Sequence, residues 1–310
     1  MSSTAPRPQS GILPEASPHA LFLTLDIRPG AESMAAARAL IKSVPTLTRD
    51  LAGDNPDGGL VSAVGIGSGA WSTISGREPP RALRDFQSRN DGLRKAPATP
   101  TDLMLHIRAQ RPDLNFELAR RILTTAPEAV IVRDETPAFR YFDARDLTGF
   151  VDGTENPEGD ERAEVALVGD EDPDFRGGSH VILQRYVHDL ARWKQLDKET
   201  QEKIIGRTRD TDEELDDAIR PDSAHISRVV IEDDGEELEI LRHSLPWGGS
   251  GEAGLVFIAY SRDANIFDRM LDRMFNLAGD GVHDNLMDYT QAMTGAYYFV
   301  PSLDQLENLA

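Results

Sequence analysis

The loop from Gly149 to Pro157 reads Gly-Phe-Val-Asp-Gly-Thr-Glu-Asn-Pro and holds Asp152 between two glycines. Glycine permits backbone torsions and close approaches that a Cβ would block, and Pro157 biases Asn156 toward an extended conformation. The pattern predicts a stiff loop that fixes one carboxylate, a group that moves protons in enzymes. An Asp-Gly pair is also typical of an ordinary surface turn, so the interpretation depends on what other reactive residues the chain supplies.

Histidines are the only strong transition-metal ligands here, because the chain has seven of them and no cysteine. None has the His-x-x-x-His or His-Glu-x-x-His spacing of a zinc hydrolase. His19, His106 and His180 lie in or at the start of apolar runs, where structural roles are expected. His188 precedes a predicted helix and is expected at the surface. The remaining candidates for ligation are His225, His243 and His283.

A hairpin is predicted beside two of these histidines. The turn signal Asp233-Asp234-Gly235 separates apolar runs at 226–231 and 238–241 that are typical of strands. Such a hairpin would bring together four residues at its base, namely His225, Arg242, His243 and Ser244. The alternative is an ordinary hairpin end with a few polar residues. A haem peroxidase needs an axial imidazole, a group that moves the proton of peroxide and a cation that stabilises the departing oxygen. This chain has a histidine, a fixed Asp and an Arg for those needs.

The elements that must position these residues follow from hydrophobic periodicity. Strands are predicted at 19–27, 60–66, 103–109 and 129–133, with helices starting at 30 and spanning 114–125. That is the βαββαβ order of a ferredoxin-like module. The pattern returns with strands at 179–183, 226–231, 238–241 and 255–260 and with helices at 189–196 and 266–277. We predict an α+β fold of duplicated ferredoxin-like modules with antiparallel sheets, similar to a dimeric α+β barrel, with domains 1–145 and 146–310.

Composition excludes several classes of protein. The chain has 310 residues and a formal net charge of −20, which argues against nucleic acid or an anionic membrane as a partner. Without cysteine there are no disulfides, thiolate metal sites or cysteine nucleophile. The polar stretch Met1 to Gly11 lacks the apolar core of a signal peptide, and no apolar run approaches the ~18 residues of a membrane span. We expect a soluble cytoplasmic protein.

The loop from Gly149 to Pro157 resembles the Gly-x-x-Asp-Gly signature of the dye-decolourising peroxidases, and the Thr-Glu-Asn-Pro tail makes the likeness more specific. The likeness covers most of the C-terminal half, and the compact chain resembles the bacterial B-type group. It includes the segments Gly177 to His180, Gly206 to Thr208, the region of His225, Leu241 to Gly248 and Thr294 to Pro301. The resemblance implies two ferredoxin-like halves and one haem b per chain, bound in the C-terminal half.

The resemblance also implies roles for individual residues. His225 corresponds to the axial ligand of the haem iron, Asp152 to the distal acid–base group and Arg242 to the distal arginine. Many B-type members have Asn where this chain has Ser244, whose hydroxyl is shorter and has one donor. We expect Ser244 to alter the rate or pH optimum without abolishing the chemistry.

Further residues are expected around the haem. A carboxylate should hydrogen-bond to the axial histidine. We prefer Asp284 to Asp288, with a solvated charge as the alternative for either. Arg207 or Arg209 is expected to pair with a haem propionate, with a surface position as the alternative for either. The loop itself is expected to contribute Gly153, Thr154 and Glu155 to cofactor binding.

The implied function is that of a haem b peroxidase, which reduces H2O2 through a ferryl intermediate and oxidises dyes, phenols or other one-electron donors. Burial beside the haem should raise the pKa of Asp152, and Arg242 should lower it. An aspartate in this role also predicts an acidic pH optimum. One alternative is a haem-handling protein with incidental peroxidase activity. A Ca²⁺ module ranks last, because no Asp-x-Asp-x-Asp-Gly loop with a closing Glu is present.

The partners are expected to be H2O2, a one-electron donor and further copies of the chain in a homo-oligomer. Some relatives enter protein shells through a C-terminal extension, and this chain has no obvious docking tail after Pro301. The acidic run 170–174 could attract Mn²⁺ but is more typical of a solvated loop. Aromatic residues available to carry electrons are Tyr141, Tyr186, Tyr289, Trp193 and Trp247.

Overall fold

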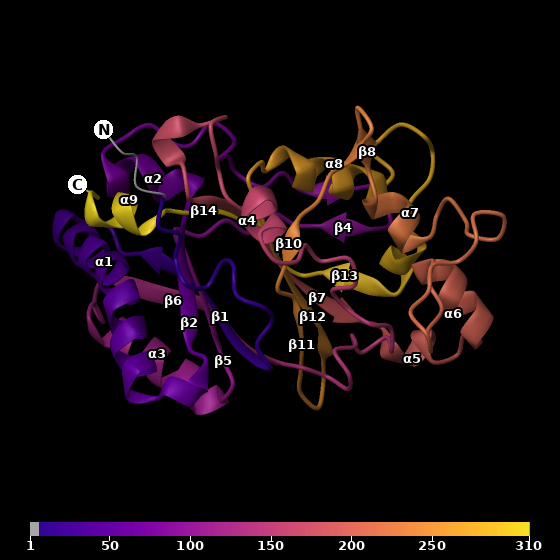
Figure 1. The fold of residues 1–310 in the computed structure, drawn as a ribbon, viewed down its shortest axis with the longest axis horizontal. Coiled ribbons are helices and arrows are strands. Elements are labelled where there is room, and N and C mark those ends of the chain that lie inside the picture. The colour runs from indigo at the N-terminus through magenta and orange to yellow at the C-terminus, as the bar shows by residue number, and fades with distance from the viewer. Residues whose placement is uncertain (1–5, 310) are drawn as a thin grey trace.

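One antiparallel sheet runs through both halves of the chain in the computed structural model, which describes residues 6–309 (Figure 1). Met1 to Ala5 of the predicted first domain, and Ala310, lie outside the described residues. Within that range the sheet has ten strands, and its main path is β10-β12-β7-β14-β2-β5-β1-β6. β11 pairs with β12 and β13 pairs with β7.

The N-terminal half has the predicted βαββαβ order. Its main elements are β1 (His19–Ile27), α1 (Ala31–Asp54), β2 (Val61–Gly67), β5 (Leu103–Ala109), α3 (Pro112–Thr124) and β6 (Val130–Phe139). Between β2 and β5 lie α2 (Ser68–Ser75) and the short strands β3 (Arg89–Asn90) and β4 (Lys95–Ala96). Helix α3 begins with Pro112, whose fixed φ suits the first turn, and Asp113 complements the helix dipole there.

The C-terminal half repeats this arrangement with longer connections. Its sheet strands are β7 (Ser179–His188), β10 (Leu241–Arg242), β11 (Leu245–Gly248), β12 (Ala253–Ser261), β13 (Thr290–Ala292) and β14 (Ala296–Val300). Its helices are α4 (Glu161–Ala166), α5 (Leu190–Trp193), α6 (Lys198–Ile205), α7 (His225–Val229), α8 (Asn265–Met274) and α9 (Leu303–Glu307). In both halves the principal strands lie in the order second, third, first, fourth. The predicted duplicated ferredoxin-like fold is therefore confirmed.

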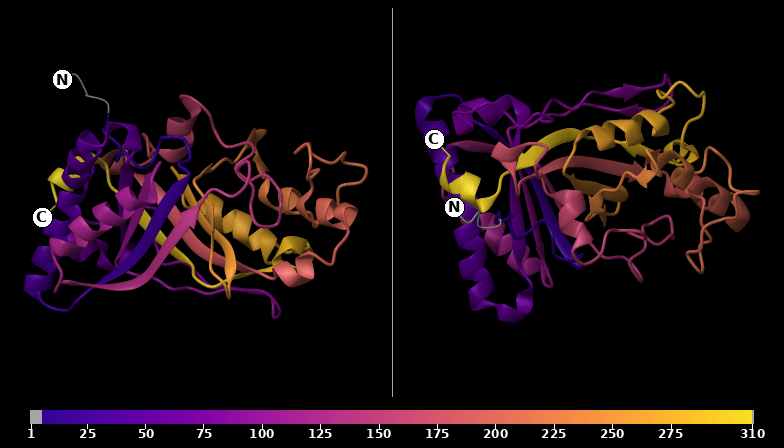
Figure 2. Two further views of the ribbon diagram at one scale, coloured as in Figure 1. Left: turned by 90° about the horizontal axis from the view of Figure 1, so that it is seen from below. Right: turned by 45° about the horizontal axis from the view of Figure 1, so that its top comes forward.

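The two half-sheets join through β14 and β2, where Tyr298 lies opposite Gly67. At the other extreme of the strand order β11 contacts β6, so the sheet curls toward a barrel. The barrel interior is filled from both halves by residues such as Phe22, Met104 and Tyr298. Helices of the two halves lie on opposite sides of the strands, and each set covers the outer face of its own half-sheet (Figure 2).

The two ends of the described chain meet on the N-terminal half (Figure 1). The side-chain amide of Gln9 donates to the carbonyl groups of Val64, 3.0 Å away, and Pro301, 2.9 Å away. From α9 and its end, Leu306 and Leu309 belong to the core beneath α1. No helix within residues 6–309 has the length and hydropathy needed to cross a membrane.

The prediction of a strand at 226–231 was wrong. This segment forms helix α7, in which the N–H of Val230 donates to the carbonyl of Ile226. Its β-branched residues favour strands, but the segment is helical and packs against α8. The turn at Asp233-Asp234-Gly235 does form, between the short strands β8 (Glu232–Asp233) and β9 (Glu236–Glu237). The helix predicted at 189–196 is only one turn long, and α6 follows it.

Candidate active site

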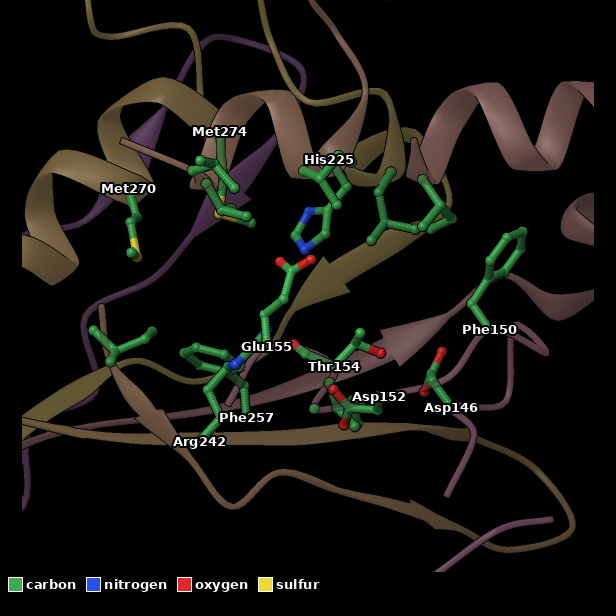
Figure 3. A pocket seen from close by; sticks show the side chains of 18 of the residues that line it. Asp146, Phe150, Asp152, Thr154, Glu155, His225, Arg242, Phe257, Met270 and Met274 are labelled. Carbon is green, nitrogen blue, oxygen red and sulfur yellow. Dashed lines mark hydrogen bonds between the residues drawn. The ribbon is translucent and has the colours of Figure 1, made fainter. Parts of the chain in front are cut away.

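A cavity of about 220 Å³ lies in the C-terminal half, between the outer face of the sheet and helices α7 and α8 (Figure 3). Strand alternation supplies its floor, because every second residue of β7 faces the same side. Those residues are Ile182, Gln184, Tyr186 and His188. The opposite wall is largely apolar and includes Ile226, Val229, Met270, Leu271 and Met274. All of the lining residues lie between positions 146 and 290 of the chain.

His225 projects into this cavity from the first residue of α7 (Figure 3). Its Nδ1 lies 2.6 Å from Oδ2 of Asp284, which is fully buried. Oδ1 of Asp284 accepts the N–H of Leu286 at 2.8 Å, which fixes the carboxylate. An ionised carboxylate can only accept, so Nδ1 carries the proton and Nε2 keeps a lone pair. Within residues 6–309 this Nε2 has no hydrogen-bond partner, as expected of an imidazole available to a metal.

The structure thus places Asp284, and not Asp288, against His225. The carboxylate of Asp288 instead bonds Nε of Arg94 at 2.8 Å and lies 3.3 Å from Nε2 of His283. His283 is consequently held in an ion-pair cluster and is not among the residues that line the cavity.

The Asp152 loop forms the wall opposite His225 (Figure 3). Gly149 and Gly153 have φ angles of +93° and +82°, so both occupy conformations that favour glycine. The N–H of Asp152 donates to the carbonyl of Ala144 at 2.9 Å. This bond ties the loop to the segment that precedes it, and the partly buried Asp152 lines the cavity.

Arg242 lies beside Asp152 on the same wall and is held by the same loop (Figure 3). Its Nη2 donates to the carbonyl of Thr154 at 2.6 Å. The side chain of Asn156 bonds both backbone groups of Arg242, accepting its N–H at 2.9 Å and donating to its carbonyl at 2.8 Å. The loop thus sets the positions of both Asp152 and Arg242.

Burial raises the pKa of Asp152 to about 6, against the opposing effect of the Arg242 guanidinium. The nearby carboxylate of Asp146 adds to the increase. The sequence left open whether burial or the arginine would prevail, and burial prevails. An acid with a pKa near the working pH can both accept and return a proton, which is the property required of an acid–base group.

A second acid in the cavity, Asp146, was missed by the sequence analysis. Its Oδ1 lies 3.1 Å from Nε2 of His188, and its Oδ2 accepts the hydroxyl of Thr148 at 2.6 Å. Burial alone would raise the pKa of Asp146, but these hydrogen bonds lower it overall. The prediction that His188 lies at the surface was wrong, because its side chain is 5% exposed and lines the cavity.

His225, Arg242, His243 and Ser244 do not form one cluster. His225 and Arg242 face each other across the cavity, whereas His243 points to the opposite side of the sheet and bonds the carbonyl of Ile12 at 2.7 Å. Ser244 is not a lining residue, and its hydroxyl accepts the N–H of Ile258 at 3.3 Å. The predicted hairpin failed to hold these residues together because its first strand is the helix α7.

The residues expected near the cofactor edge, Gly153, Thr154, Glu155 and Arg207, all line the cavity. Nη1 of Arg207 bonds Oε1 of Glu155 at 2.6 Å, and the hydroxyl of Thr154 donates to Asp212 at 2.6 Å. Glu155 also has a positive φ of 63°. Arg209 is not a lining residue and instead donates to Gln201 at 2.9 Å. Of the two arginines considered for a propionate, only Arg207 reaches the cavity.

The cavity fits a haem group in the chemistry of its lining. One wall presents the free Nε2 of His225, and the walls between are apolar, as the faces of a porphyrin require. Two lining residues also carry buried polar atoms without a partner within residues 6–309, namely Nε of Arg242 and Nε2 of Gln184. Unpaired buried donors are rare in folded proteins and point to an absent ligand or water. A carboxylate-supported imidazole facing an acid and an arginine defines a haem-binding oxidoreductase.

Comparison with known proteins agrees with this class. The model of the Dyp-type peroxidase C-terminal domain matches residues 143–305, and that of the N-terminal domain matches residues 9–140. A dye-decolorizing peroxidase of Mycobacterium tuberculosis is 42% identical over 99% of this chain and 92% of its own length. DyPB from Rhodococcus jostii RHA1 has a TM-score of 0.95 and 42% identity, and the match covers 99% of each chain. A crystal structure of a Dyp-type peroxidase from Shewanella oneidensis, at 39% identity, also has a TM-score of 0.95 and covers 99% of this chain and 100% of that chain.

The chain belongs to the Dyp-type peroxidase family. Members of this family are haem-dependent peroxidases that act on hydrogen peroxide, and this chain is one of them. Variants of DypB from Rhodococcus jostii RHA1 have been crystallised in complex with heme.

Proposed function

We propose that Asp152, Arg242 and His225 carry the peroxidase chemistry of this chain. His225 is the axial ligand of the haem iron, Asp152 moves the proton of hydrogen peroxide, and Arg242 stabilises the negative charge that develops as the O–O bond breaks. The arrangement on the wall facing His225 carries the proposal: an acid with a pKa of about 6 lies beside an arginine that the same loop fixes. A haem carrier has little need of such a pair.

When bound, haem supplies an iron that binds peroxide and stores two oxidising equivalents. Asp152 must be ionised to take the proton from the inner oxygen of peroxide, and it then returns this proton to the outer oxygen, which leaves as water. Arg242 is permanently cationic, so its charge is present whenever the oxygen departs. The loop that bonds both residues keeps them ordered before peroxide arrives.

On the His225 side of the cavity, Asp284 tunes the ligand itself. Asp284 accepts the Nδ1 proton of His225 and gives the imidazole partial anionic character, which favours high oxidation states of iron. Because Asp284 is fully buried and holds a second hydrogen bond, the imidazole cannot rotate freely. We assign Gly153, Thr154, Glu155 and Arg207 to the rim of the haem, with Arg207 toward a propionate. Ser244 acts through the backbone of β12 and not by direct contact.

The test uses haem-loaded protein and the optical spectrum after stoichiometric peroxide, in the wild type and in His225→Ala, Asp152→Ala and Arg242→Ala. We expect the wild type to show a rapid shift of the Soret band. His225→Ala should lose the axial-ligand signature of its resting spectrum, and the two distal variants should keep that spectrum but react slowly. Unchanged iron ligation in His225→Ala, or an unchanged rate in both distal variants, would refute the assignment.

We propose further that residues 146–310 form the haem-binding domain, residues 1–145 the domain that completes the barrel, and that one haem b binds per chain. All lining residues of the cavity fall within the second range, which supports this division. A cytoplasmic homo-oligomer and a phenolic or dye-like electron donor follow from the family resemblance. Light scattering at several protein concentrations tests the oligomer, and turnover with phenols and dyes compares the donors.

A further inference from the structure

A tyrosine and a histidine form a fully buried pair behind the active-site wall. The hydroxyl of Tyr260, on β12, lies 2.9 Å from Nδ1 of His106, on β5. Both side chains have no exposed surface, and they come from different halves of the chain. The catalytic assignments above use neither residue.

The direction of the hydrogen bond follows from the strengths of the donor and the acceptor. Nε2 of His106 is buried without a partner within residues 6–309, and the hydroxyl of Tyr260 has only Nδ1 of His106. In either neutral tautomer one proton and one acceptor of the pair stay unpaired. A phenol is a stronger donor than an imidazole N–H, and an imine nitrogen is a stronger acceptor than a phenolic oxygen. We therefore assign Tyr260 as the donor and His106 as a neutral acceptor.

The pair lies one sheet thickness behind the cavity. Across β10 and β12, Leu241 pairs with Tyr260 and Arg242 pairs with Ala259. Successive side chains of a strand point to opposite faces, so Phe257 lines the cavity while Tyr260 enters the barrel core. The phenol is therefore adjacent in the sheet to the backbone of the distal arginine.

The surroundings of the pair keep it ordered and uncharged. The ring of Phe22 stacks on His106 with 4.7 Å between centroids, and His243 packs edge-on against Tyr260 at 5.7 Å. Arg108 is the nearby cation, and its guanidinium bonds Nδ1 of His243 at 3.2 Å. Burial raises the pKa of Tyr260 and lowers that of His106, so the phenol keeps its proton until an electron leaves.

Among the described tyrosines, only Tyr260 donates to an imidazole. Tyr298 bonds the hydroxyl of Thr101 at 2.7 Å, and Tyr186 donates to the side-chain amide of Gln184 at 3.1 Å. Tyr297 donates to Asp268, whose charge is already paired with Arg84 and Arg89. Hydroxyl and amide oxygens are very weak bases, and the Asp268 carboxylate is already bound to two arginines. The neutral imidazole of His106 is therefore the partner suited to take up a phenolic proton.

We propose that Tyr260 is an internal redox site of this peroxidase, with His106 as its proton acceptor. One electron passes from the phenol to the haem that peroxide has oxidised, and the phenolic proton moves to Nδ1 of His106. The products are a neutral tyrosyl radical and an imidazolium. A one-electron donor later returns the electron, and the proton goes back to the phenolic oxygen. An oxidised phenol is a strong acid, so even an imidazole of lowered pKa accepts its proton.

This inference rests on the proposed peroxide chemistry, and its test separates the two. Haem-loaded protein is mixed with stoichiometric peroxide and frozen for electron paramagnetic resonance, while the Soret band is followed in parallel. The proteins compared are the wild type, Tyr260→Phe, His106→Phe and the matched control Tyr298→Phe, which also loses one buried hydroxyl in the barrel. Growth on ring-deuterated tyrosine identifies a tyrosyl signal by its narrowed hyperfine pattern.

We expect a tyrosyl signal in the wild type and in Tyr298→Phe and its loss in Tyr260→Phe and His106→Phe, with a similar Soret change in all four. An unchanged radical in Tyr260→Phe overturns this inference and leaves the peroxidase assignment intact. A wild type whose Soret band does not respond overturns both. If a variant fails to fold, wild-type protein in D2O gives the answer, because a radical without a coupled exchangeable proton contradicts the hydrogen bond to His106.

Discussion

The side-chain amide of Asn156 makes both of the backbone hydrogen bonds that a neighbouring strand would make to Arg242, at 2.8 and 2.9 Å. β10 is the edge of the sheet, and its other side pairs with β12. Asn156 therefore takes the place of a missing strand beside Arg242. This relationship couples the conformation of the Asp152 loop to the position of the Arg242 guanidinium.

Asn156→Ala should weaken both the fold and the chemistry. Loss of two hydrogen bonds of this type costs about 1–3 kcal/mol of unfolding free energy, and displacement of Arg242 should slow the reaction with peroxide about tenfold. Urea denaturation and stopped-flow kinetics measure the two effects. Asn156→Asp is the matched variant, because it keeps the acceptor for the N–H of Arg242 but sets a carboxylate against its carbonyl. A destabilised Asn156→Ala protein with the wild-type peroxide rate would show that the amide is only structural.

Asp284→Asn should alter the proximal side without removing the axial ligand. The amide has nearly the same shape but cannot give the imidazole of His225 anionic character, so the reduction potential of bound haem should rise and its affinity fall by roughly 10–100-fold. Spectroelectrochemistry and haem titration measure these changes. Asp288→Asn is the control, because Asp288 bonds Arg94 and not His225. Equal effects of the two substitutions would contradict a special role for Asp284.

The peroxide reaction should speed up as the pH rises through about 6, the pKa to which burial raises Asp152. Below that value the carboxyl is protonated and cannot accept a proton from peroxide. This step should therefore lack the acidic optimum that an aspartate at its reference pKa predicts. Arg242 lowers the pKa of Asp152 and Asp146 raises it. Arg242→Ala should therefore move the rise in rate to higher pH, and Asp146→Asn should move it to lower pH. Stopped-flow rates of the peroxide reaction between about pH 4 and pH 8 measure this rise, because that range spans both the ordinary pKa of an aspartate and the raised pKa of Asp152. If Arg242→Ala and Asp146→Asn moved the rise in rate in the same direction, the titrating group could not be Asp152.

The same raised pKa makes Asp152 a source of instability in the haem-free protein. The folded state binds the proton more tightly than the unfolded state, so the stabilising effect of protonation is complete below about pH 4 and is lost as the pH rises through about 6. Asp152→Asn should therefore stabilise the haem-free protein at pH 7 by up to about 3 kcal/mol. Urea denaturation at pH 7 and at pH 4 tests this, because the advantage should disappear at the lower pH. An equal gain at both values would point to another cause.

Local chemistry explains why the loop could be predicted and the proximal helix could not. Gly149 and Gly153 have positive φ angles that their residue type already suggests. The segment that begins at His225 has β-branched residues typical of a strand, but it is a helix that packs against α8 and α6, and these tertiary contacts cannot be read from the local sequence. His225 was nevertheless proposed as a site residue, because the motif resemblance does not depend on secondary structure, and it lines the cavity.

The sequence contained a signal for the position of His188, namely the alternation of side chains along its strand, and the prediction did not use it. The predicted strand ended at position 183, whereas β7 continues to His188. Alternation along the longer strand places Gln184, Tyr186 and His188 in the cavity with Ile182. The polar residues concealed the strand because they face the active site and not the solvent. The Asp146–His188 pair could not be predicted, since it joins residues from two elements whose approach depends on the whole fold.

Ser244 provides the final prediction, because its place in the structure separates it from the distal pair. Its hydroxyl accepts the N–H of Ile258 and it does not line the cavity. Ser244→Ala should leave that N–H unpaired, at a cost of about 1 kcal/mol of unfolding free energy, while the rate of the peroxide reaction stays within about twofold, as for a residue away from the reacting atoms. Ser244→Asn restores the larger amide of many B-type relatives and tests whether a longer side chain reaches the cavity. Stopped-flow rates and urea denaturation of the two variants decide the question, and a large loss of rate in Ser244→Ala would return this residue to the catalytic group.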